Sequence, residues 1–176
     1  MPRFVAFLRA INVGGHTVEM AKLKKLFEQL SLDAVETFIA SGNVIFDAPR
    51  TAPATLEKKI AAHLESSLGY EVATFLRRPE ELVAALAHRA FRSAAPGATL
   101  YIGFQASPSA AAAAKQVAAL STDGDDLLVH GRETYWRRHG NFSDSSLSGA
   151  KVEKALGQPT TFRKVTTVEK LAKKYG

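Results

Sequence analysis

Apolar residues in the first 77 positions form short runs whose spacing alternates between strand-like and helix-like. Residues 3–11 are apolar on both parities apart from Arg9, which is typical of a central strand covered on both faces. Helical spacing with lysines opposite begins at Met20, and Gly42-Asn43 is a hairpin signal between two later strands. The predicted elements are strand 3–11, helix 20–30, strands on either side of 41–43, helix 56–68 and strand 70–77. This order, β-α-β-β-α-β, is the ferredoxin-like unit.

The same order recurs in the second half, after a linking helix that starts at Pro79 with two glutamates in its first turn. The last helix opens with Thr166-x-x-Glu169, the spacing of a capping box, and is predicted to bury Val168, Leu171 and Tyr175. The predicted elements are helix 79–88, strand 99–105, helix 109–120, a hairpin over 126–137 turning at His130-Gly131, helix 147–156, strand 159–163 and the last helix. The repeat is one of topology and not of residues.

These patterns predict an α+β protein built by tandem duplication of two ferredoxin-like (βαββαβ, α/β plait) units, with extra linking and C-terminal helices. The predicted boundaries are 1–78 for the N-terminal unit, 79–97 for the linking helix and loop, and 98–176 for the C-terminal unit with its terminal helix. The packing of the two units and the oligomeric state are left open.

Composition narrows the class of protein. The 176 residues contain no cysteine, which excludes disulfides, thiolate nucleophiles and cysteine metal sites and fits a reducing compartment. No signal-like segment or bilayer-length apolar run is present, so we expect a cytoplasmic protein with no membrane contact. The net charge is +6, and residues 151–176 hold seven basic side chains against two acidic ones. This end suits either a phosphate backbone or, more simply, a solubilising helix face.

Two loops supply the candidate site. In a sheet ordered 4-1-3-2, the first and third strands are antiparallel neighbours, so the end of the first lies beside the beginning of the third. We therefore expect the loop after the first strand to meet the hairpin turn, at what we call the strand-1 corner. Its residues are Arg9, Asn12, Gly14, Gly15, Ser41, Gly42 and Asn43. A guanidinium, two carboxamides, a hydroxyl and a helix start suit a phosphate or carboxylate.

The same residues also have a structural interpretation. The two asparagines serve equally for loop hydrogen bonds and left-handed turns, and Arg9 serves equally for binding backbone carbonyls. Arg163, at the end of the last strand, is a weaker ligand-binding candidate for which a structural role is favoured.

Other chemistry-bearing residues are less informative. The run Tyr135-Trp136-Arg137-Arg138 is compatible with base stacking, although Trp136 is expected in the core. The five histidines show no metal-ligand spacing, so no metal and no cofactor are expected, and His16 beside the glycine pair is the one histidine worth testing as an acid or base. The serines of 143–148 suit the N-cap of a helix.

Three stretches resemble the domain of unknown function 1697 family. They are LRAINVGG from Leu8, SGNVIFD from Ser41 and TFRKVTTVEKL from Thr161. The resemblance covers nearly the whole chain and implies a tandem pair of ferredoxin-like plaits, with no established activity. The chain has Ala10 where that family usually has Gly, and Lys164 and Val165 where it usually has Asn and Trp.

The sequence leaves three functions open. The first is a binding module for an anionic, phosphate-containing small molecule or a nucleic acid at the strand-1 corner. The second is a small phosphate- or acyl-transfer hydrolase in which Arg9 stabilises developing charge and Asn43 orients water. In the third, the corner is purely structural.

Overall fold

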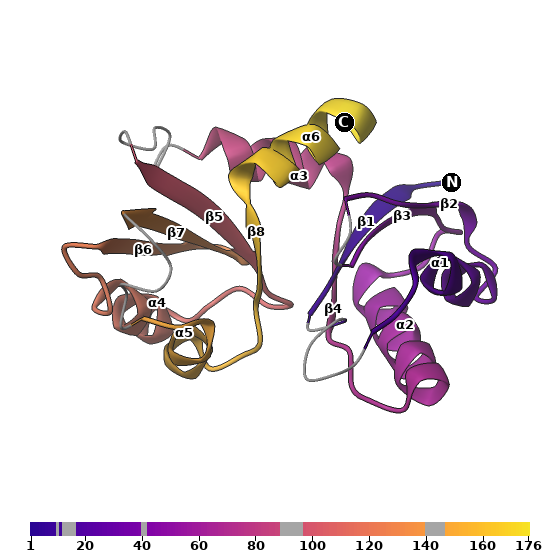
Figure 1. Ribbon diagram of the computed structural model, residues 1–176, viewed down its shortest axis with the longest axis horizontal. Coiled ribbons are helices and arrows are strands. Elements are labelled where there is room, and N and C mark those ends of the chain that lie inside the picture. Colours follow the sequence, from indigo (N-terminus) through magenta and orange to yellow (C-terminus); the bar gives the residue numbers. More distant parts are fainter. Residues whose placement is uncertain (10, 12–16, 40–41, 89–96, 140–146) are drawn as a thin grey trace. The chain divides into compact units, whose positions relative to one another are not determined.

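The computed structural model describes residues 1–9, 11, 17–39, 42–88, 97–139 and 147–176. Within these residues the chain forms eight strands and six helices, and the strands make two four-stranded antiparallel sheets. The chain divides into two compact units, Met1–Glu81 and Leu82–Gly176, whose elements can be followed by colour in Figure 1. The fold is therefore α+β, consistent with a duplicated α/β unit.

The first unit has its strands in the predicted order, with β2-β3-β1-β4 across the sheet. Helices α1 and α2 lie on one face of this sheet (Figure 1). The elements are β1 (Arg3–Leu8), α1 (Met20–Glu28), β2 (Asp33–Thr37), β3 (Asn43–Asp47), α2 (Pro53–Leu68), β4 (Thr74–Arg77) and the start of α3 (Pro79–Ala87). The predicted antiparallel pairing of the first and third strands is confirmed, with Phe4 opposite Phe46 and Phe7 opposite Asn43.

The core of the first unit lies between the sheet and its two helices. Phe46 stacks on Phe4 at 6.0 Å and meets Phe27 of α1 at 5.6 Å between ring centroids. On the other face of β1, Val5 and Phe7 are also fully buried, which confirms the predicted central strand covered on both sides. Burial of such side chains contributes about 1.5–3 kcal/mol each.

Three predicted boundaries in this unit were too long. Strand β1 ends at Leu8 instead of residue 11, and β4 begins at Thr74 instead of residue 70, because the last pair between these strands is Leu8 with Thr74. Helix α1 ends at Glu28, where the chain turns, and Ser31 then takes a φ of 59°. In each case the strand pairing or the turn made the element shorter than the run of apolar residues.

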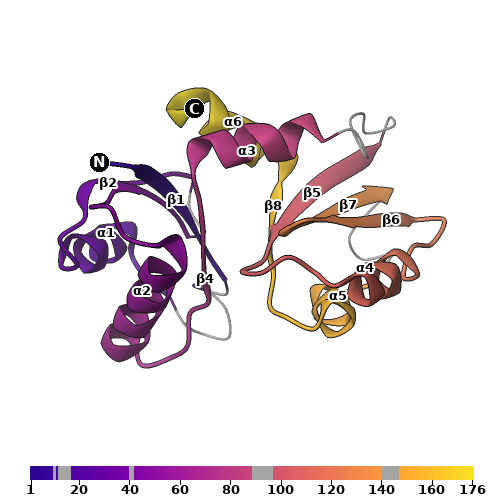
Figure 2. The same cartoon turned by 180° about the vertical axis from the view of Figure 1, so that it is seen from behind.

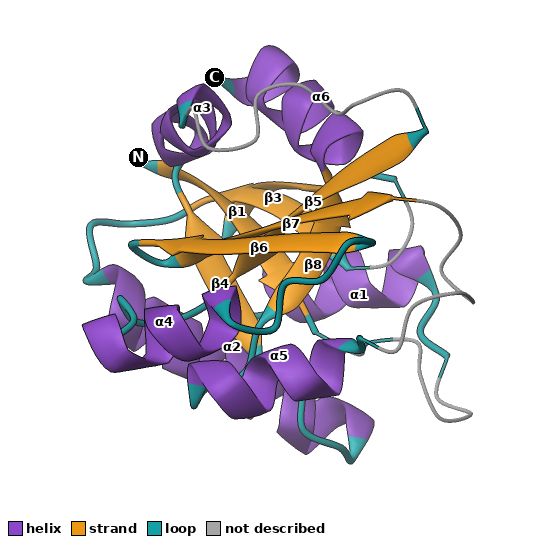
Figure 3. Ribbon diagram, turned by 90° about the vertical axis from the view of Figure 1, so that its left-hand side faces the viewer, coloured by secondary structure: helices purple, strands orange, loops and turns teal. Residues whose placement is uncertain are grey.

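The second unit repeats the arrangement, with the strand order β6-β7-β5-β8. Helices α4 and α5 cover one face of this sheet, as the view from behind in Figure 2 shows. The elements are β5 (Ala98–Phe104), α4 (Ala111–Ala118), β6 (Asp125–His130), β7 (Glu133–His139), α5 (Gly149–Leu156), β8 (Thr161–Lys164) and α6 (Val165–Tyr175). Figure 3 shows α4 beside α5, and these helices pack on each other.

Trp136 organises the core of this unit, as predicted. It is 3% exposed and meets Phe162 edge-on at 5.3 Å between ring centroids. The hairpin turns after His130, where Gly131 takes a φ of 59°, as the dipeptide signal predicted. Helix α5 is capped by Ser148, whose hydroxyl accepts a hydrogen bond from the Lys151 N–H, and this confirms the predicted capping serine.

The prediction for the last helix was wrong at its start. Helix α6 begins at Val165, so Lys164 is the N-cap residue and makes no side-chain capping bond. Thr166 is already inside the helix, and the Thr166-x-x-Glu169 spacing is therefore not a capping box. Val168 and Leu171 are buried as predicted, whereas Tyr175 is half-buried. None of the helices in the described ranges is long and apolar enough to cross a bilayer.

Candidate functional site

The strand-1 corner exists as a junction of the two predicted strand ends. The Leu8 N–H donates to the Gly42 carbonyl oxygen at 2.8 Å, so the end of β1 lies against the beginning of β3. Arg9 follows directly, with its side chain half-buried and its backbone N–H bonded to the Ala73 carbonyl oxygen at 2.9 Å. The remaining predicted residues Asn12, Gly14, Gly15 and Ser41, with Ala10 and His16, lie outside the described residues.

Asn43 serves the hairpin. It is 2% exposed, and its side-chain amide donates to the carbonyl oxygens of Phe38 and Ile39, both at 3.1 Å. The Phe38 N–H in turn donates to the Asn43 carbonyl oxygen at 3.0 Å. These bonds hold the backbone of the turn to the buried Asn43 side chain and satisfy carbonyl groups of the hairpin. The structural interpretation of Asn43 therefore accounts for its side chain.

Position 42 requires a glycine for two reasons, its backbone conformation and the lack of space for a side chain. Its φ of +83° lies in the left-handed region, which a side chain disfavours. A Cβ atom at this position would lie 3.0 Å from the Leu8 Cβ and 3.1 Å from the Ile11 Cγ2. The two strand ends can approach this closely because the position has no side chain.

Arg163 belongs to β8 of the second unit. Its Nη1 donates to the Thr161 hydroxyl at 2.7 Å and to the Phe162 carbonyl oxygen at 3.0 Å. Burial lowers the pKa of Arg163 to about 10, so the guanidinium is still charged at neutral pH. The contacts within its own strand agree with the structural role favoured for this residue.

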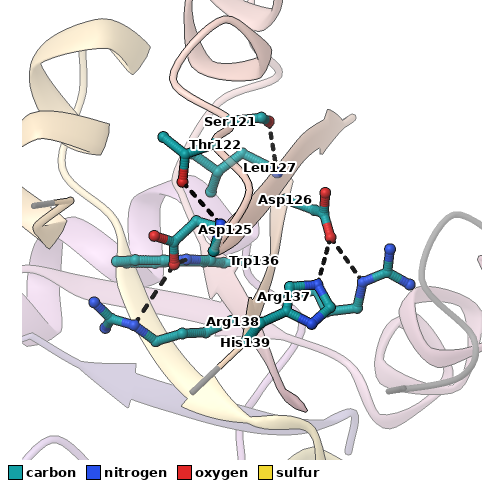
Figure 4. Close-up of polar contacts among 10 residues, drawn as sticks. Ser121, Thr122, Asp125, Asp126, Leu127, Trp136, Arg137, Arg138 and His139 are labelled. Carbon is teal, nitrogen blue, oxygen red and sulfur yellow. Dashed lines mark hydrogen bonds and ion pairs between the residues drawn. The ribbon is translucent and has the colours of Figure 1, made fainter. Parts of the chain in front are cut away.

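The aromatic and basic run on β7 does not form a base-stacking surface. Tyr135, Trp136 and Arg138 are each no more than 3% exposed. The Trp136 Nε1 donates to Asp125 at 2.7 Å, and the Arg138 guanidinium lies over the indole ring, 5.0 Å from its centroid (Figure 4). Asp125 also pairs with the Arg138 Nε at 3.5 Å. A buried polar cluster of this kind orders the core and leaves no ring face for a base.

A second polar cluster lies on the opposite face of the same hairpin. The Asp126 Oδ2 accepts a hydrogen bond from the Arg137 Nε at 2.9 Å and lies 3.0 Å from the His139 Nε2 (Figure 4). The His139 hydrogen bond, followed by that of Arg137, lowers the pKa of the Asp126 carboxyl. Neither aspartate was singled out from the sequence, although two adjacent acids opposite two adjacent arginines are the signal of cross-strand pairing.

A basic depression lies at the other end of the first sheet from the corner. We call it the arginine depression. It has a volume of about 770 Å³ and is lined by Met1, Pro2, Arg50, Thr51, Ala52 and Arg78. No acidic side chain is among these described lining residues. Both arginines are exposed, and the Arg78 guanidinium lies over the Phe4 ring at 5.7 Å from its centroid, with Glu80 at 3.9 Å.

The start of α2 faces this depression. The N-cap residue Ala52 has no side-chain capping bond, Pro53 occupies the first turn, and no acidic residue follows in that turn. The first N–H groups of a helix have no intrahelical acceptor, and the helix dipole is positive there. Arg50 and Arg78 were not singled out from the sequence. Their positions in the sequence were the feature that could have identified them. Arg50 precedes the helix-starting Pro53 by three residues, and Arg78 directly precedes Pro79.

Arg3, which begins β1 at the same end of the sheet as the arginine depression, is already paired with an acidic side chain. The Arg3 Nε donates to the Asp47 carboxylate at 2.8 Å, and this hydrogen bond lowers the pKa of Asp47. Elsewhere in the described ranges no group of three or more His, Asp or Glu side chains is arranged to hold a metal ion. The lining of the arginine depression contains two arginines and no acidic side chain.

Comparison with known proteins supports the family but supplies no activity. No curated protein matches the chain. A solved structure, that of the conserved bacterial protein SP0830 from Streptococcus pneumoniae, superposes with a TM-score of 0.72 at 24% identity and covers 99% of both chains. That similarity shows a shared fold. The model of the family described as protein of unknown function (DUF1697) matches residues 1–135. The chain therefore belongs to the DUF1697 family.

Proposed function

We propose that the protein binds a small anionic, phosphate-containing molecule at the arginine depression of its first unit. The observation that carries this proposal is the combination of two exposed arginines with a lining that has no carboxylate. Arginine forms paired charge-assisted hydrogen bonds with phosphate oxygens, and two such side chains suit one phosphate group. The depression, at about 770 Å³, has the size of a small-molecule site.

The backbone around the depression supports the same ligand class. The uncapped first turn of α2 presents N–H donors and a positive dipole end, both of which favour an anion. Thr51 adds a hydroxyl to the lining. Arg78 is braced by its position over the Phe4 ring, which reduces the conformational freedom lost when it binds a ligand.

Binding is favoured over catalysis for a specific reason. The hydrolase hypothesis requires Asn43 to orient a water molecule, but its amide N–H groups donate to the Phe38 and Ile39 carbonyls and the residue is 2% exposed. Nucleic-acid binding loses its stacking surface on β7 for a similar reason, because Tyr135 and Trp136 are buried. A phosphorylated small molecule therefore agrees best with the described side chains.

The test is a calorimetric and thermal-shift screen of the full chain against inorganic phosphate, pyrophosphate and phosphorylated metabolites at low salt. A ligand at 100 times its Kd adds about 2.7 kcal/mol to the free energy of unfolding. We expect this gain to vanish in the double variant Arg50→Ala/Arg78→Ala and to weaken as salt is added. The Arg50→Lys/Arg78→Lys variant should bind with intermediate affinity, because lysine keeps the charge but not the planar fork.

The matched control is Lys58→Ala/Lys59→Ala. These two lysines are exposed on α2 and do not line the depression, so the control removes the same amount of positive charge from elsewhere on the first unit. Binding that survives in the arginine variant, or that is lost equally in both variants, would refute the proposed site. An additional Arg9→Ala variant tests the strand-1 corner, since loss of binding there alone would return the ligand to the position predicted from sequence.

We also infer that each unit is a ferredoxin-like plait and that the two arose by duplication. What supports this is the β-α-β-β-α-β order within each unit and the equivalent strand orders β2-β3-β1-β4 and β6-β7-β5-β8. Independent expression of residues 1–78 and 98–176 tests the predicted boundaries.

A further inference from the structure

We propose that the stacked pair His88 and His130 is an acid-sensitive latch that holds the C-terminal turn of α3 on the second sheet. His88 directly follows α3, and His130 is the last residue of β6. Their rings lie 4.0 Å apart between centroids with an interplanar angle of 14°. Because both belong to the second unit, the inference is independent of the arginine depression.

The contacts around the pair show what the latch holds. The Tyr135 hydroxyl donates to the Ala85 carbonyl oxygen at 2.7 Å, and the His88 ring meets the Tyr135 ring at 5.2 Å between centroids. Leu82 and Ala85 are buried, and Ala85 and Leu86 line a small cavity together with Leu100 and Ile102 of β5. Among the described residues, a hydrogen bond, this apolar contact and the ring contacts of His88 attach the last turn of α3 to the sheet.

Helix α3 lies in the segment of the chain that joins the two compact units, so its attachment affects that segment. The boundary between the two compact units falls between Glu81 and Leu82, inside this helix. Release of its last turn loosens the segment through which the chain passes from one unit to the other. Opening of such local elements requires much less free energy than global unfolding.

Protonation of the pair opposes the stack. Two neutral imidazoles stack as aromatic rings, whereas two imidazolium rings at 4.0 Å repel each other. Burial, followed by the charge of His130, lowers the pKa of His88. Glu133 acts in the opposite direction, because its carboxylate attracts the protonated ring.

Two further titratable groups face His88. Tyr135 and Glu169 line the cavity of about 70 Å³ that His88 also lines, and burial raises the pKa of Tyr135 so that its hydroxyl stays protonated. Because the native pKa of His88 lies below its ordinary 6.5, the attachment is complete above about pH 6.5 and weakens as the pH falls below it.

The first measurement is a proton NMR titration of the histidine rings in the full chain. We expect the His88 midpoint below 6.5, and a midpoint at or above that value would overturn the proposal. The second measurement is amide hydrogen exchange of residues 84–88 at pH 7.5 and pH 5.0, corrected for intrinsic rates. We expect these amides to exchange faster at pH 5.0 than at pH 7.5, because acid weakens the attachment of this turn.

The double variant His88→Phe/His130→Phe keeps two stacked rings but cannot be protonated. We expect its exchange at residues 84–88 to lose the acid-dependent increase, while His63→Phe, the same change in the first unit, keeps it. If the double variant is not folded at pH 7.5, the single His88→Phe change makes the same distinction, because it removes the ring whose pKa burial lowers. An acid-dependent increase that persists in the Phe variant, or its absence in the unmodified chain, refutes the latch.

Discussion

At one end of the first sheet, where β1 ends and β3 begins, the Asn43 amide is bonded to two carbonyl oxygens and Gly42 fills a space too small for a side chain. At the other end, where β1 begins and α2 starts, Arg50 and Arg78 line a depression that has no acidic side chain among its lining residues, although Glu80 lies 3.9 Å from Arg78. At the strand-1 corner, the Asn43 amide is used in hydrogen bonds within the fold. At the arginine depression, the side chains of Arg50 and Arg78 are exposed. The residue types alone did not distinguish these two roles, because an arginine, a glycine and an asparagine suit either one.

The largest expected effect is the loss of stability caused by Gly42→Ala. A left-handed φ costs an alanine about 1–2 kcal/mol, and overpacking against Leu8 and Ile11 adds about 1–3 kcal/mol. Thermal unfolding should therefore shift down by roughly 5–15 °C for a chain of this length. The same variant should still bind any ligand of the arginine depression at temperatures where it is folded.

Gly69→Ala is the matched control for this experiment. Gly69 has the same φ of +83° but open space where a Cβ would lie. Its substitution should cost only the conformational part, about 1–2 kcal/mol. Equal melting temperatures for the two variants would show that close packing at the corner contributes nothing to stability. The structural role assigned to this end of the sheet would then be refuted.

Asn43→Ala is expected to have the next largest effect. It removes both amide donors, and each of these two hydrogen bonds contributes about 0.5–1.5 kcal/mol to the free energy of unfolding. Chemical denaturation with a constant m-value measures this loss. Asn43→Asp should be no better, because a carboxylate cannot donate to a carbonyl. A variant with unchanged stability and impaired ligand binding would instead place a site at the corner.

The topology of both units could be predicted from the sequence because it rests on periodicity and turn chemistry. Alternating and helical apolar spacings predicted each element, and Gly42-Asn43 and His130-Gly131 predicted both hairpin turns. Element ends were less accurate, because β1 stops where its pairing with β4 stops, at Leu8, although the apolar pattern continues to Ile11.

The candidate site was harder to predict because its residues are distant in the sequence. Arg50 and Arg78 are 28 positions apart, and both line the depression because β3 and β4 end on the same side of the sheet. The residues selected from the sequence instead lie beside glycines at the opposite strand ends.

The smallest expected effect concerns the paired arginine at the depression end. The Arg3 hydrogen bond lowers the pKa of Asp47, so this carboxyl is a stronger acid in the folded state than in the unfolded state. Its contribution to stability is therefore present above the ordinary value of 3.8 and is lost as the pH falls through the lower native pKa. Because the pair is partly exposed, the contribution should be about 0.2–1 kcal/mol.

Comparison of the unmodified chain with Asp47→Asn tests this contribution and the contrast between the two ends. The difference in free energy of unfolding should be constant between pH 5 and 7 and should shrink to zero on acidification below pH 3.8, as urea titrations would measure. The substitution also removes the negative charge that neutralises Arg3, so it should leave ligand binding at the arginine depression intact or strengthen it. A loss of binding in Asp47→Asn would mean that this end of the sheet, like the other, depends on its polar contacts for its shape.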